Sequence, residues 1–339
     1  MLSPPTTRRL ILFQWEGLMA PSNPRVSLGM PVYNGERYLE KTLDAVLAQT
    51  YKDFELVISD NGSSDRTQEI CERYAKMDPR VKYHRNSKNI GIAPNFNRAY
   101  ELTSGEYFKW TDYDDLLAPM FLERCVEILD KHPNVACAFP KTRLIDQEDN
   151  PIRDFEPPDD ACSPQAHIRF KSLILDPDHI VSQASGLMRR EQVGGTVMHG
   201  SYPCSDEVFL AHLALLGDFY EIPEFLFLYR IHPKQSTKGV LASERARVRF
   251  FDTSLEGQVV LIKWLYFKNC LHAINHAPIS VYQRFRCYLY MVRWLAVVRN
   301  FRSIAKDAML AFHQWIPIFP RLYKETLDAS VSAEYSSST

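Results

Sequence analysis

Three aspartates in the first half of the chain lie within four positions of one another. They belong to the stretch Trp-Thr-Asp-Tyr-Asp-Asp, in which Asp112, Asp114 and Asp115 carry the carboxylates. Like charges at this spacing repel one another unless a positive group lies among them, and a hard divalent cation with oxygen ligands would supply that charge. An acidic turn that caps a following helix is the alternative interpretation.

The segments around these aspartates favour the functional interpretation. Residues 107–110, Tyr-Phe-Lys-Trp, are typical of a buried strand, and an apolar pattern with helical spacing follows Pro119, which suits the first turn of a helix. The three acids would therefore stand at the carboxyl end of a strand, in the turn before a helix. In open α/β sheets, ligands bind at that edge.

Strands and helices alternate before the aspartates. Strands are predicted at 26–30, 54–59 and 81–84, and a helix is predicted after each of them, the last one carrying Asn95 and Asn97. This alternation predicts a parallel sheet with helices on both faces. For the whole main domain we expect a mixed, mainly parallel α/β sheet flanked by helices.

Two helix starts and several later strands complete the predicted architecture. Asp65, with Gln68 three residues on, predicts a capping box. Ser205 is predicted to cap a helix that ends at Gly217. Further strands are predicted at 135–139, with 142–145 as its candidate partner, at 180–188 and at 225–231.

Two common nucleotide-binding signatures are absent from the sequence. No Gly-x-Gly-x-x-Gly follows the first predicted strand, and no Gly-x-x-x-x-Gly-Lys-Ser/Thr occurs. Polar residues stand at the ends of predicted strands instead, namely Asn34, Asp60 and Asp112. Such side chains can hold a base and a ribose by hydrogen bonds.

The overall composition is that of an ordinary globular protein. Of 339 residues, 45% are apolar and 24% are charged, and the formal net charge of −1 gives no sign of a nucleic acid partner. The seven cysteines form no Cys-x-x-Cys pair, so we expect free thiols in a reducing compartment. No run of about twenty apolar residues predicts a transmembrane helix. We therefore expect a cytoplasmic protein.

Four regions are predicted along the chain: a flexible extension at 1–24, a main domain at 25–240, a helical region at 241–328 and a disordered tail at 329–339. Residues 241–325 hold thirteen Lys and Arg against five Asp and Glu, with aromatic residues among the arginines. Two interpretations stay open. Either the aromatic residues pack on the main domain while the arginines face water, or the helices contact an anionic membrane at its inner face.

Five motifs in the same order resemble family 2 glycosyltransferases of the GT-A fold. They are Pro31-Val32-Tyr33-Asn34, Asp60 to Asp65, Asp112 to Asp115, Ser205-Asp206-Glu207 and Tyr229 to Pro233. The resemblance covers residues 25–235. It implies inverting transfer of a sugar from a nucleotide-diphosphate sugar, with a UDP-sugar favoured, to a glycan or lipid-linked acceptor, assisted by a divalent cation, Mn²⁺ or Mg²⁺.

The resemblance also implies roles for individual residues. The implied nucleotide-sugar-binding residues are Pro31, Val32, Tyr33, Asn34, Glu36, Asp60, Asn61, Asp112, Asp114 and Arg230. Asp114 is the first implied metal ligand, with Asp112 beside it and His232 as a candidate third ligand. For His232 a phosphate contact or a purely structural role stays open, and for Arg230 the alternative to a diphosphate contact is a surface ion pair.

The acceptor hydroxyl needs a base to take its proton. The family supplies a carboxylate from a Glu-Asp pair at a helix start, where this chain has Ser205 and Asp206, followed by Glu207. Asp206 matches the acid that matters in the family, but the choice between Asp206 and Glu207 stays open. Acids that only stabilise the start of the helix are the alternative.

Two other functions compete with an active transferase. A non-catalytic protein that binds nucleotide sugars or glycans could use the same fold. The presence of both Asp114 and a candidate base favours the enzyme. An enzyme that makes the sugar nucleotide itself would want a Gly-rich loop with Lys or Arg after the first strand, and residues 31–36 do not resemble one.

Overall fold

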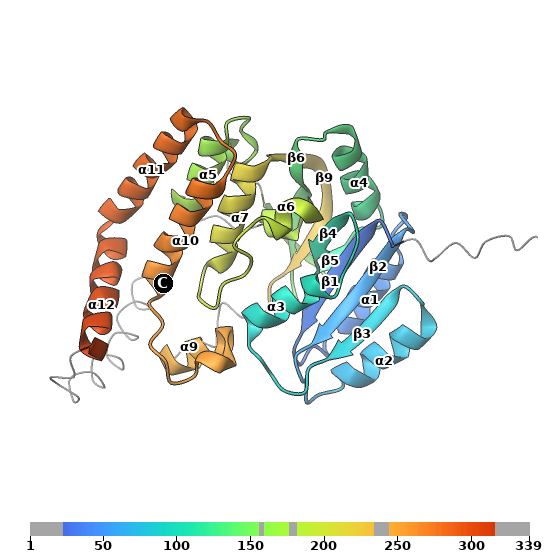
Figure 1. Ribbon diagram of the computed structural model, residues 1–339. Coiled ribbons are helices and arrows are strands. Elements are labelled where there is room, and N and C mark those ends of the chain that lie inside the picture. The colour runs from blue at the N-terminus through green and yellow to red at the C-terminus, as the bar shows by residue number, and fades with distance from the viewer. Residues whose placement is uncertain (1–22, 156–158, 176–181, 234–243, 316–339) are drawn as a thin grey trace, which may run out of the picture.

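The computed structural model describes residues 23–155, 159–175, 182–233 and 244–315. Most of the predicted amino-terminal extension and all of the predicted tail lie outside these ranges. Within them, nine strands form one mixed sheet in the order β3-β2-β1-β4-β8-β6-β9-β5, with β7 paired to β6 (Figure 1). The strands are β1 Val26–Val32, β2 Phe54–Asp60, β3 Val81–Arg85, β4 Tyr107–Trp110, β5 Leu116–Leu117, β6 Val135–Ile145, β7 Pro151–Phe155, β8 Leu187–Arg189 and β9 Asp218–Arg230.

Helices cover both faces of this sheet. They are α1 Leu39–Leu47, α2 Thr67–Met77, α3 Ile92–Glu101, α4 Phe121–Lys131, α5 Ala166–Leu175, α6 Arg190–Gly194, α7 Ser205–Leu216, α9 Glu244–Phe251, α10 Ile262–His276, α11 Val281–Ala296 and α12 Val298–Trp315. Short 3₁₀ turns lie at Asp159–Cys162, Ser182–Ser185 and Thr253–Leu255. The predicted fold class, a mixed, mainly parallel α/β sheet flanked by helices with a helical carboxyl-terminal region, is confirmed.

The amino-terminal half of the sheet is parallel, as predicted. β1 pairs with β2 and β4, and β2 pairs with β3, all in parallel. Every residue of β1 and β2 is buried, because the sheet is covered on both faces and such strands lose the polar alternation of half-exposed ones. The register sets Val32 beside Asp60 and Gly29 beside Trp110. The carboxyl ends of β1, β2 and β4 therefore meet at one edge.

The second half of the sheet departs from the prediction in three places. The segments 135–139 and 142–145 are one continuous strand, β6, which shifts register near Pro140 instead of turning back. β9 begins at Asp218, before the predicted start, and runs through Pro223 where its register shifts against β6. Proline is tolerated in a strand at such bulges, so neither proline ends its strand.

The third departure concerns the strand predicted at 180–188. Only Leu187–Arg189 form a strand, β8, which lies antiparallel between β4 and β6, and Ser182–Ser185 form a 3₁₀ turn. Positions 180 and 181 fall outside the described residues. β8 makes the sheet mixed, because it runs against both of its neighbours.

The ends of three helices also differ from the prediction. α2 begins at Thr67, and Asp65 accepts a hydrogen bond from the Thr67 backbone N–H at 3.0 Å without forming the expected box with Gln68. α7 begins at Ser205 itself, preceded by Cys204 in a left-handed conformation at φ 61°. α4 begins at Phe121, so the proline at position 119 precedes the helix.

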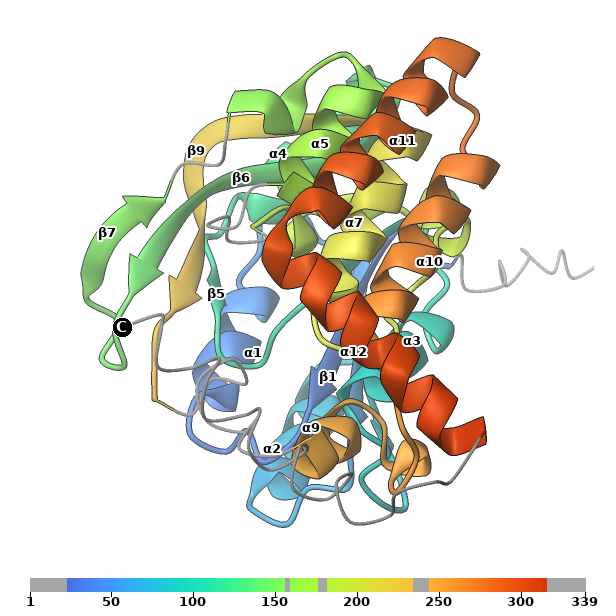
Figure 2. The same ribbon diagram turned by 90° about the vertical axis from the view of Figure 1, so that its left-hand side faces the viewer.

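Two hydrophobic cores lie on opposite faces of the sheet. α1, α2 and α4 pack on one face. On the other face, α5, α7, α10 and α11 form a second core with β4 and β6. Figure 2 shows α10, α11 and α12 at the outer side of this second layer, in front of α7. No helix among the described residues has the length and apolar character needed to cross a membrane.

Candidate active site

The acidic loop, residues 112–115, follows β4 at the edge where the parallel strands end. Asp115 is only 4% exposed, and its Oδ1 accepts a hydrogen bond from the Arg230 backbone N–H at 2.8 Å. The Thr42 hydroxyl of α1 donates to the carbonyls of Tyr113 and Asp115, at 2.9 Å each. The loop is thus held from two sides, by α1 and by the end of β9, and Asp115 serves this anchoring.

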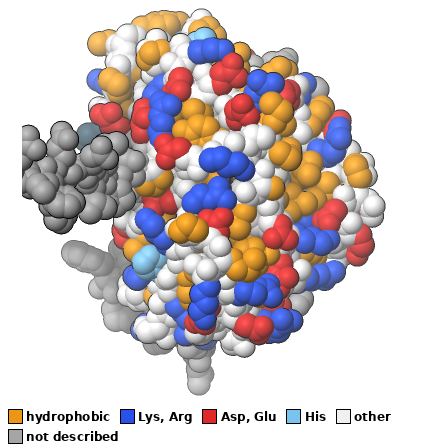
Figure 3. Space-filling view, turned by 90° about the vertical axis from the view of Figure 1, so that its right-hand side faces the viewer, with side chains coloured by type: hydrophobic (Ala, Val, Ile, Leu, Met, Phe, Trp, Pro, Cys, Tyr) orange, Lys and Arg blue, Asp and Glu red, His pale blue; other side chains and the backbone are white. Residues whose placement is uncertain are grey.

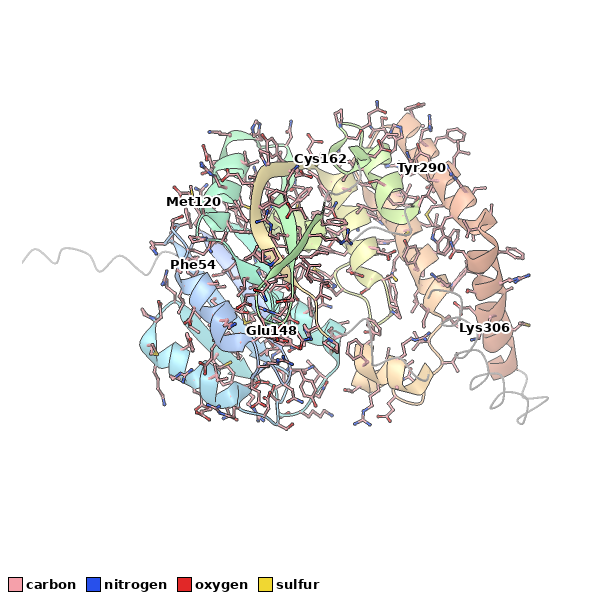
Figure 4. All side chains as sticks on the ribbon, turned by 180° about the vertical axis from the view of Figure 1, so that it is seen from behind. Phe54, Met120, Glu148, Cys162, Tyr290 and Lys306 are labelled. Atoms are coloured by element: carbon pink, nitrogen blue, oxygen red, sulfur yellow. The ribbon has the colours of Figure 1, made fainter. Side chains whose placement is uncertain are left out.

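Arg230 is fully buried and attached to the same loop. Its Nε donates to the carbonyl of Asp114 at 2.7 Å, and its Nη1 pairs with Asp149. Asp149 stands in the β6–β7 turn, where Figure 4 labels Glu148, and it also pairs with Lys41 of α1. Arg230 therefore ties the acidic loop to the hairpin and to α1, while its expected contact with a diphosphate stays a prediction.

The acidic loop carries negative charge that the protein only partly offsets. Burial and the neighbouring charge of Asp114 raise the pKa of Asp112 to about 6. The same causes raise the pKa of Asp115 well above its usual range. The ammonium of Lys109, buried below the loop, donates to the carbonyls of Trp110 at 2.9 Å and Ser185 at 2.5 Å. Burial lowers the pKa of Lys109 to about 8. The positive charge of Lys109 acts to lower the pKa values of Asp112 and Asp115, but burial and the neighbouring carboxylates outweigh it.

His232 lies against Asp114. Its Nε2 is 2.9 Å from Oδ2 of Asp114, the imidazole is 5% exposed, and the ring of Tyr38 stacks at a tilt with centroids 5.0 Å apart. His232 can therefore orient the Asp114 carboxylate.

The oxygen donors of the acidic loop fit a hard divalent cation. Asp112 and Asp114 are partly exposed, and their uncompensated charge is the kind that Mg²⁺ or Mn²⁺ neutralises. Across the described part of the chain, no group of three or more His, Cys, Asp or Glu side chains is arranged to hold a metal ion. Mg²⁺ commonly completes its shell with water and substrate phosphates, so two carboxylates suit such a site.

Asp60 sits at the end of β2 in a closed set of hydrogen bonds. Its Oδ1 accepts from the backbone N–H and the hydroxyl of Ser63, at 2.9 and 2.6 Å. Its Oδ2 accepts from the Tyr83 hydroxyl at 2.7 Å and lies 3.3 Å from Nε of Arg85. Asp60 is fully buried, so it organises the β2 turn as well as standing at the expected donor site.

Asn61 joins this turn to the loop that precedes α3. Its Oδ1 accepts from Ile90 N–H at 2.9 Å and from the Asn86 side chain at 3.2 Å, and its Nδ2 donates to the Gly91 carbonyl at 3.1 Å. Gly91 has φ of +96°, and a Cβ there would lie 2.5 Å from the Asp252 Cα. Only glycine allows the segment after α9 to pack against this loop.

The end of β1 presents the most accessible of the expected donor residues. Pro31 and Val32 are buried within the strand, whereas Tyr33 is 43% exposed and Asn34 and Glu36 are exposed. Asn34 adopts φ of 52°, which places its amide oxygen within 2.9 Å of a backbone N–H in the β2 turn. A hydrogen bond therefore connects the turn after β1 to the turn after β2.

The structure separates Asp206 from Glu207. Glu207 accepts a hydrogen bond from the Tyr266 hydroxyl of α10 at 3.2 Å, so it faces the helical layer. Asp206 lies in the first turn of α7, beside the end of β4, since Phe209 of α7 packs edge-on against Trp110 with ring centroids 5.1 Å apart. After burial and Asp114, the charge of Asp206 is a lesser cause of the raised pKa of Asp112. It also contributes, after burial and the loop carboxylates, to the raised pKa of Tyr229.

The loop between α6 and α7 packs on the end of β4, on α3 and on α7. The His199 ring packs edge-on against Trp110, with centroids 4.7 Å apart, and stacks on Phe209 at 5.4 Å. Asn97 of α3 donates to the His199 carbonyl at 2.9 Å and accepts from its N–H at 3.1 Å. Asn97 is therefore a structural residue that anchors this loop.

Sequence reasoning missed two contributors to the site. The first is Lys109, which the sequence pattern places only within a strand. A lysine between buried aromatic residues can indicate a functional position, because a lysine is almost never fully buried without partners. The second is Asp149, which lies far from the motifs in the sequence. No local pattern around it indicates a functional role. Its contact with Arg230 depends on the tertiary fold.

Comparison with known proteins identifies the family of this chain. Residues 27–193 match the sequence model of glycosyl transferase family 2. The chain is 35% identical over 223 residues to an uncharacterized glycosyltransferase of Rickettsia typhi, which covers 65% of this chain and 68% of that protein. It is also 36% identical over 129 residues to the chondroitin synthase of Escherichia coli, covering 38% of this chain and 19% of that protein.

Solved structures share the fold at low sequence identity. TarS of S. aureus, in a structure with UDP-GlcNAc, superimposes with a TM-score of 0.60 at 14% identity, over 84% of this chain and 79% of that chain. Its complex with UDP gives a TM-score of 0.57 at 16% identity, over 81% and 73%. Since a curated relative above 30% identity is matched over two thirds of its length and the fold agrees, this chain belongs to glycosyl transferase family 2 and is a glycosyltransferase of the GT-A fold.

Proposed function

We propose that this glycosyltransferase transfers a sugar, with inversion, from a nucleotide-diphosphate sugar to a hydroxyl of a glycan or a lipid-linked acceptor. The observation that carries the proposal is the meeting of two separate acidic groups at one edge of the sheet. The acidic loop follows β4 and Asp206 lies in the first turn of α7, and these two elements meet where Trp110 of β4 packs edge-on against Phe209 of α7, with ring centroids 5.1 Å apart. One acidic group can then bind the cation that neutralises the leaving group, while the other takes the proton of the acceptor hydroxyl.

The donor would lie along the ends of β1, β2 and β4. Tyr33, Asn34 and Glu36 are accessible there, and Asp60 and Asn61 brace the turns beneath them. We favour a UDP-sugar, on the resemblance of the strand-end motifs. The TarS structures with the same fold contain UDP or UDP-GlcNAc, which is compatible with this choice.

Asp114 and Asp112 would hold a divalent cation, Mn²⁺ or Mg²⁺, with His232 orienting Asp114. When bound, the cation would neutralise the charge that develops on the departing diphosphate. Arg230 and Thr42 keep the loop backbone in place for this purpose.

Asp206 would act as the general base. The acceptor hydroxyl oxygen attacks the anomeric carbon, the bond from that carbon to the diphosphate oxygen breaks, and the nucleoside diphosphate leaves with the bonding electrons. The hydroxyl proton passes to the Asp206 carboxylate. Attack from the face opposite the leaving group inverts the anomeric carbon. The start of α7 favours an anionic carboxylate ready to accept the proton.

A panel of donors tests the proposal. UDP-glucose, UDP-galactose, UDP-N-acetylglucosamine and GDP-mannose are offered to the protein with Mn²⁺, with Mg²⁺ and with a chelator, and binding and slow hydrolysis are measured. We expect at least one UDP-sugar to bind more tightly with a cation than with chelator. Binding to none of the donors, together with binding to a glycan array, would replace the proposal with the non-catalytic alternative.

A further inference from the structure

The outermost helix of the molecule presents an apolar face to solvent. On α11, the side chains that lie outward are largely exposed: Val281 at 83%, Tyr282 at 60%, Phe285 at 58%, Leu289 at 45% and Val292 at 61%. Their spacing of three and four residues places them on one side of the helix. On α12, Phe301 at 63% and Met309 at 59% add to this surface, which we name the α11–α12 face.

The opposite side of α11 already supplies the packing that the fold needs. Cys287, Tyr290, Met291 and Trp294 are buried in the core shared with α5 and α10. Trp294 stacks on Tyr266 of α10, with ring centroids 5.1 Å apart. α11 is therefore apolar on both sides. This pattern is typical of a helix whose two sides are both shielded from water.

An apolar hollow lies in the same surface, between α10, α11 and α12. It has a volume of about 490 Å³, and every side chain that lines it is apolar, including Trp264, Phe267 and Ile304. Trp264 is itself 48% exposed at the rim. An apolar hollow beside an exposed apolar stripe suits hydrocarbon chains better than a polar ligand.

Basic residues dominate the charge around this face. Residues 257–315 contain eight Lys and Arg and a single acid, Asp307, which is buried and accepts a hydrogen bond from the Trp264 backbone N–H at 2.9 Å. Arg293 and Arg302 are exposed beside the apolar stripe, and Arg286 donates to the hydroxyl of Tyr282 at 3.1 Å. The far side of the molecule differs, because acidic and basic side chains are interspersed there (Figure 3).

We propose that the α11–α12 face docks on the surface of an anionic lipid bilayer. α11 would lie along the interface, with Phe285, Leu289 and Val292 among the acyl chains and Arg293 and Arg302 at the level of the phosphates. Figures 1 and 2 place α11 and α12 outermost, with the sheet behind them, so the bilayer would meet these helices first. The inference does not depend on the proposed sugar transfer.

Vesicle flotation with the full chain tests this inference. Vesicles of phosphatidylcholine alone are compared with vesicles that also contain phosphatidylglycerol, at low and at high salt. We expect binding to the anionic vesicles at low salt, weaker binding at high salt because salt screens the arginines, and little binding to neutral vesicles.

Matched variants locate the contact. Phe285→Asp with Leu289→Asp should abolish vesicle binding, whereas Met77→Asp on α2, a residue 70% exposed, should leave it unchanged. Arg293→Glu with Arg302→Glu should weaken binding at least about 25-fold, at about fivefold for each basic side chain lost from an anionic surface. Lys76→Glu on α2 is the control for charge. Circular dichroism checks that each variant is folded.

Three results would overturn the inference. They are no binding of the parent protein to anionic vesicles at low salt, equal binding to neutral and anionic vesicles, and equal losses in the α2 and α11 variants. Sedimentation supplies a fourth. If the parent forms a dimer that Phe285→Asp with Leu289→Asp converts to a monomer, then a second copy of the chain covers this face.

Discussion

Asp206 and Glu207 are chemically similar neighbours with different surroundings. Glu207 is hydrogen-bonded to Tyr266 of the helical layer, while the Asp206 charge acts on the acidic loop. Successive side chains on a helix point about 100° apart, so these two adjacent carboxylates have different main neighbours. At the scale of single residues, we therefore expect Asp206 rather than Glu207 to meet the acceptor.

Replacing Asp206 tests the proposed base. Asp206→Asn keeps the size of the side chain but cannot take a proton, so we expect turnover to fall by roughly 10²–10⁴-fold while donor affinity holds. Glu207→Gln should lower turnover far less, because it can still accept a hydrogen bond from Tyr266. Single-turnover transfer, measured with donor binding, checks both. Loss of transfer in Glu207→Gln alone would show that the base is Glu207.

Replacing Asp114 tests the proposed cation site. Asp114→Asn removes one anionic oxygen ligand, so Mn²⁺ or Mg²⁺ should bind the donor complex at least about tenfold more weakly, by analogy with the loss of a charge-assisted contact. Asp53→Asn is the control, because Asp53 is exposed just before β2, at the opposite end of the strand. Calorimetric titration of the metal with donor present is the measurement. Equal affinities in the parent and Asp114→Asn would exclude Asp114 as a ligand.

At the scale of elements, the site is assembled by side chains that tie one loop to another. Asn61 joins the β2 turn to the loop before α3, and Arg230 joins the acidic loop to the β6–β7 hairpin. The loop before α7 is held by Asn97 and by the aromatic packing of His199. These contacts hold the loops in a fixed arrangement before any ligand binds.

The His199 packing predicts an acid-sensitive loop. Burial lowers the pKa of His199 from 6.5 to about 4, so between these values the unfolded chain binds a proton that the folded protein does not. The stabilising contribution is complete above pH 6.5 and is lost as the pH falls toward 4. The full loss is at most roughly 3–4 kcal/mol, at roughly 1.4 kcal/mol for each pKa unit.

Denaturant unfolding across this pH range checks the prediction. His199→Phe keeps an aromatic ring without the titrating group, so its free energy of unfolding should fall less on acidification than that of the parent protein. His84→Gln is the control, because His84 is exposed on the edge strand β3. An identical pH dependence in the parent and His199→Phe would show that folding does not lower the pKa of His199.

At the scale of the whole molecule, the carboxyl-terminal helices α10 and α11 pack into the same core as α5 and α7. α7 is apolar all round, and residues from α5 and α10 complete the core that buries it. The boundary near residue 240 stays a prediction, and α10 and α11 beyond it share a core with β4 and β6. We therefore expect residues 25–240 and the helical region to unfold together.

Two tryptophan variants test this coupling. Trp294→Ala should cost about 3–5 kcal/mol, because a ring that is 4% exposed leaves a large cavity. Trp264→Ala, at a site 48% exposed, should cost much less. Hydrogen exchange should report that Trp294→Ala lowers the protection of β1 and β2 as well as that of α11. Lower protection confined to α10–α12 would show that the helices form a separate unit.

The sequence by itself determined the parallel half of the sheet and the place of the acidic loop. Buried runs such as 54–59, ended by Asn-Gly and acidic turns, are local signals that do not depend on distant partners. The family and its GT-A fold followed from these motifs and are confirmed. The role of each site residue is still a prediction that the variants above address.

The tertiary structure alone decided how distant segments meet. β6 and β9 pass through Pro140 and Pro223 because their mutual pairing accommodates a bulge, which no local pattern shows. The burial of Arg230 depends on Asp149, which lies 81 residues away along the chain. The exposed face of α11 likewise depends on which side of the helix the core occupies. Contacts of this kind cannot be predicted from local patterns, because the two partners lie far apart in the sequence at no characteristic spacing.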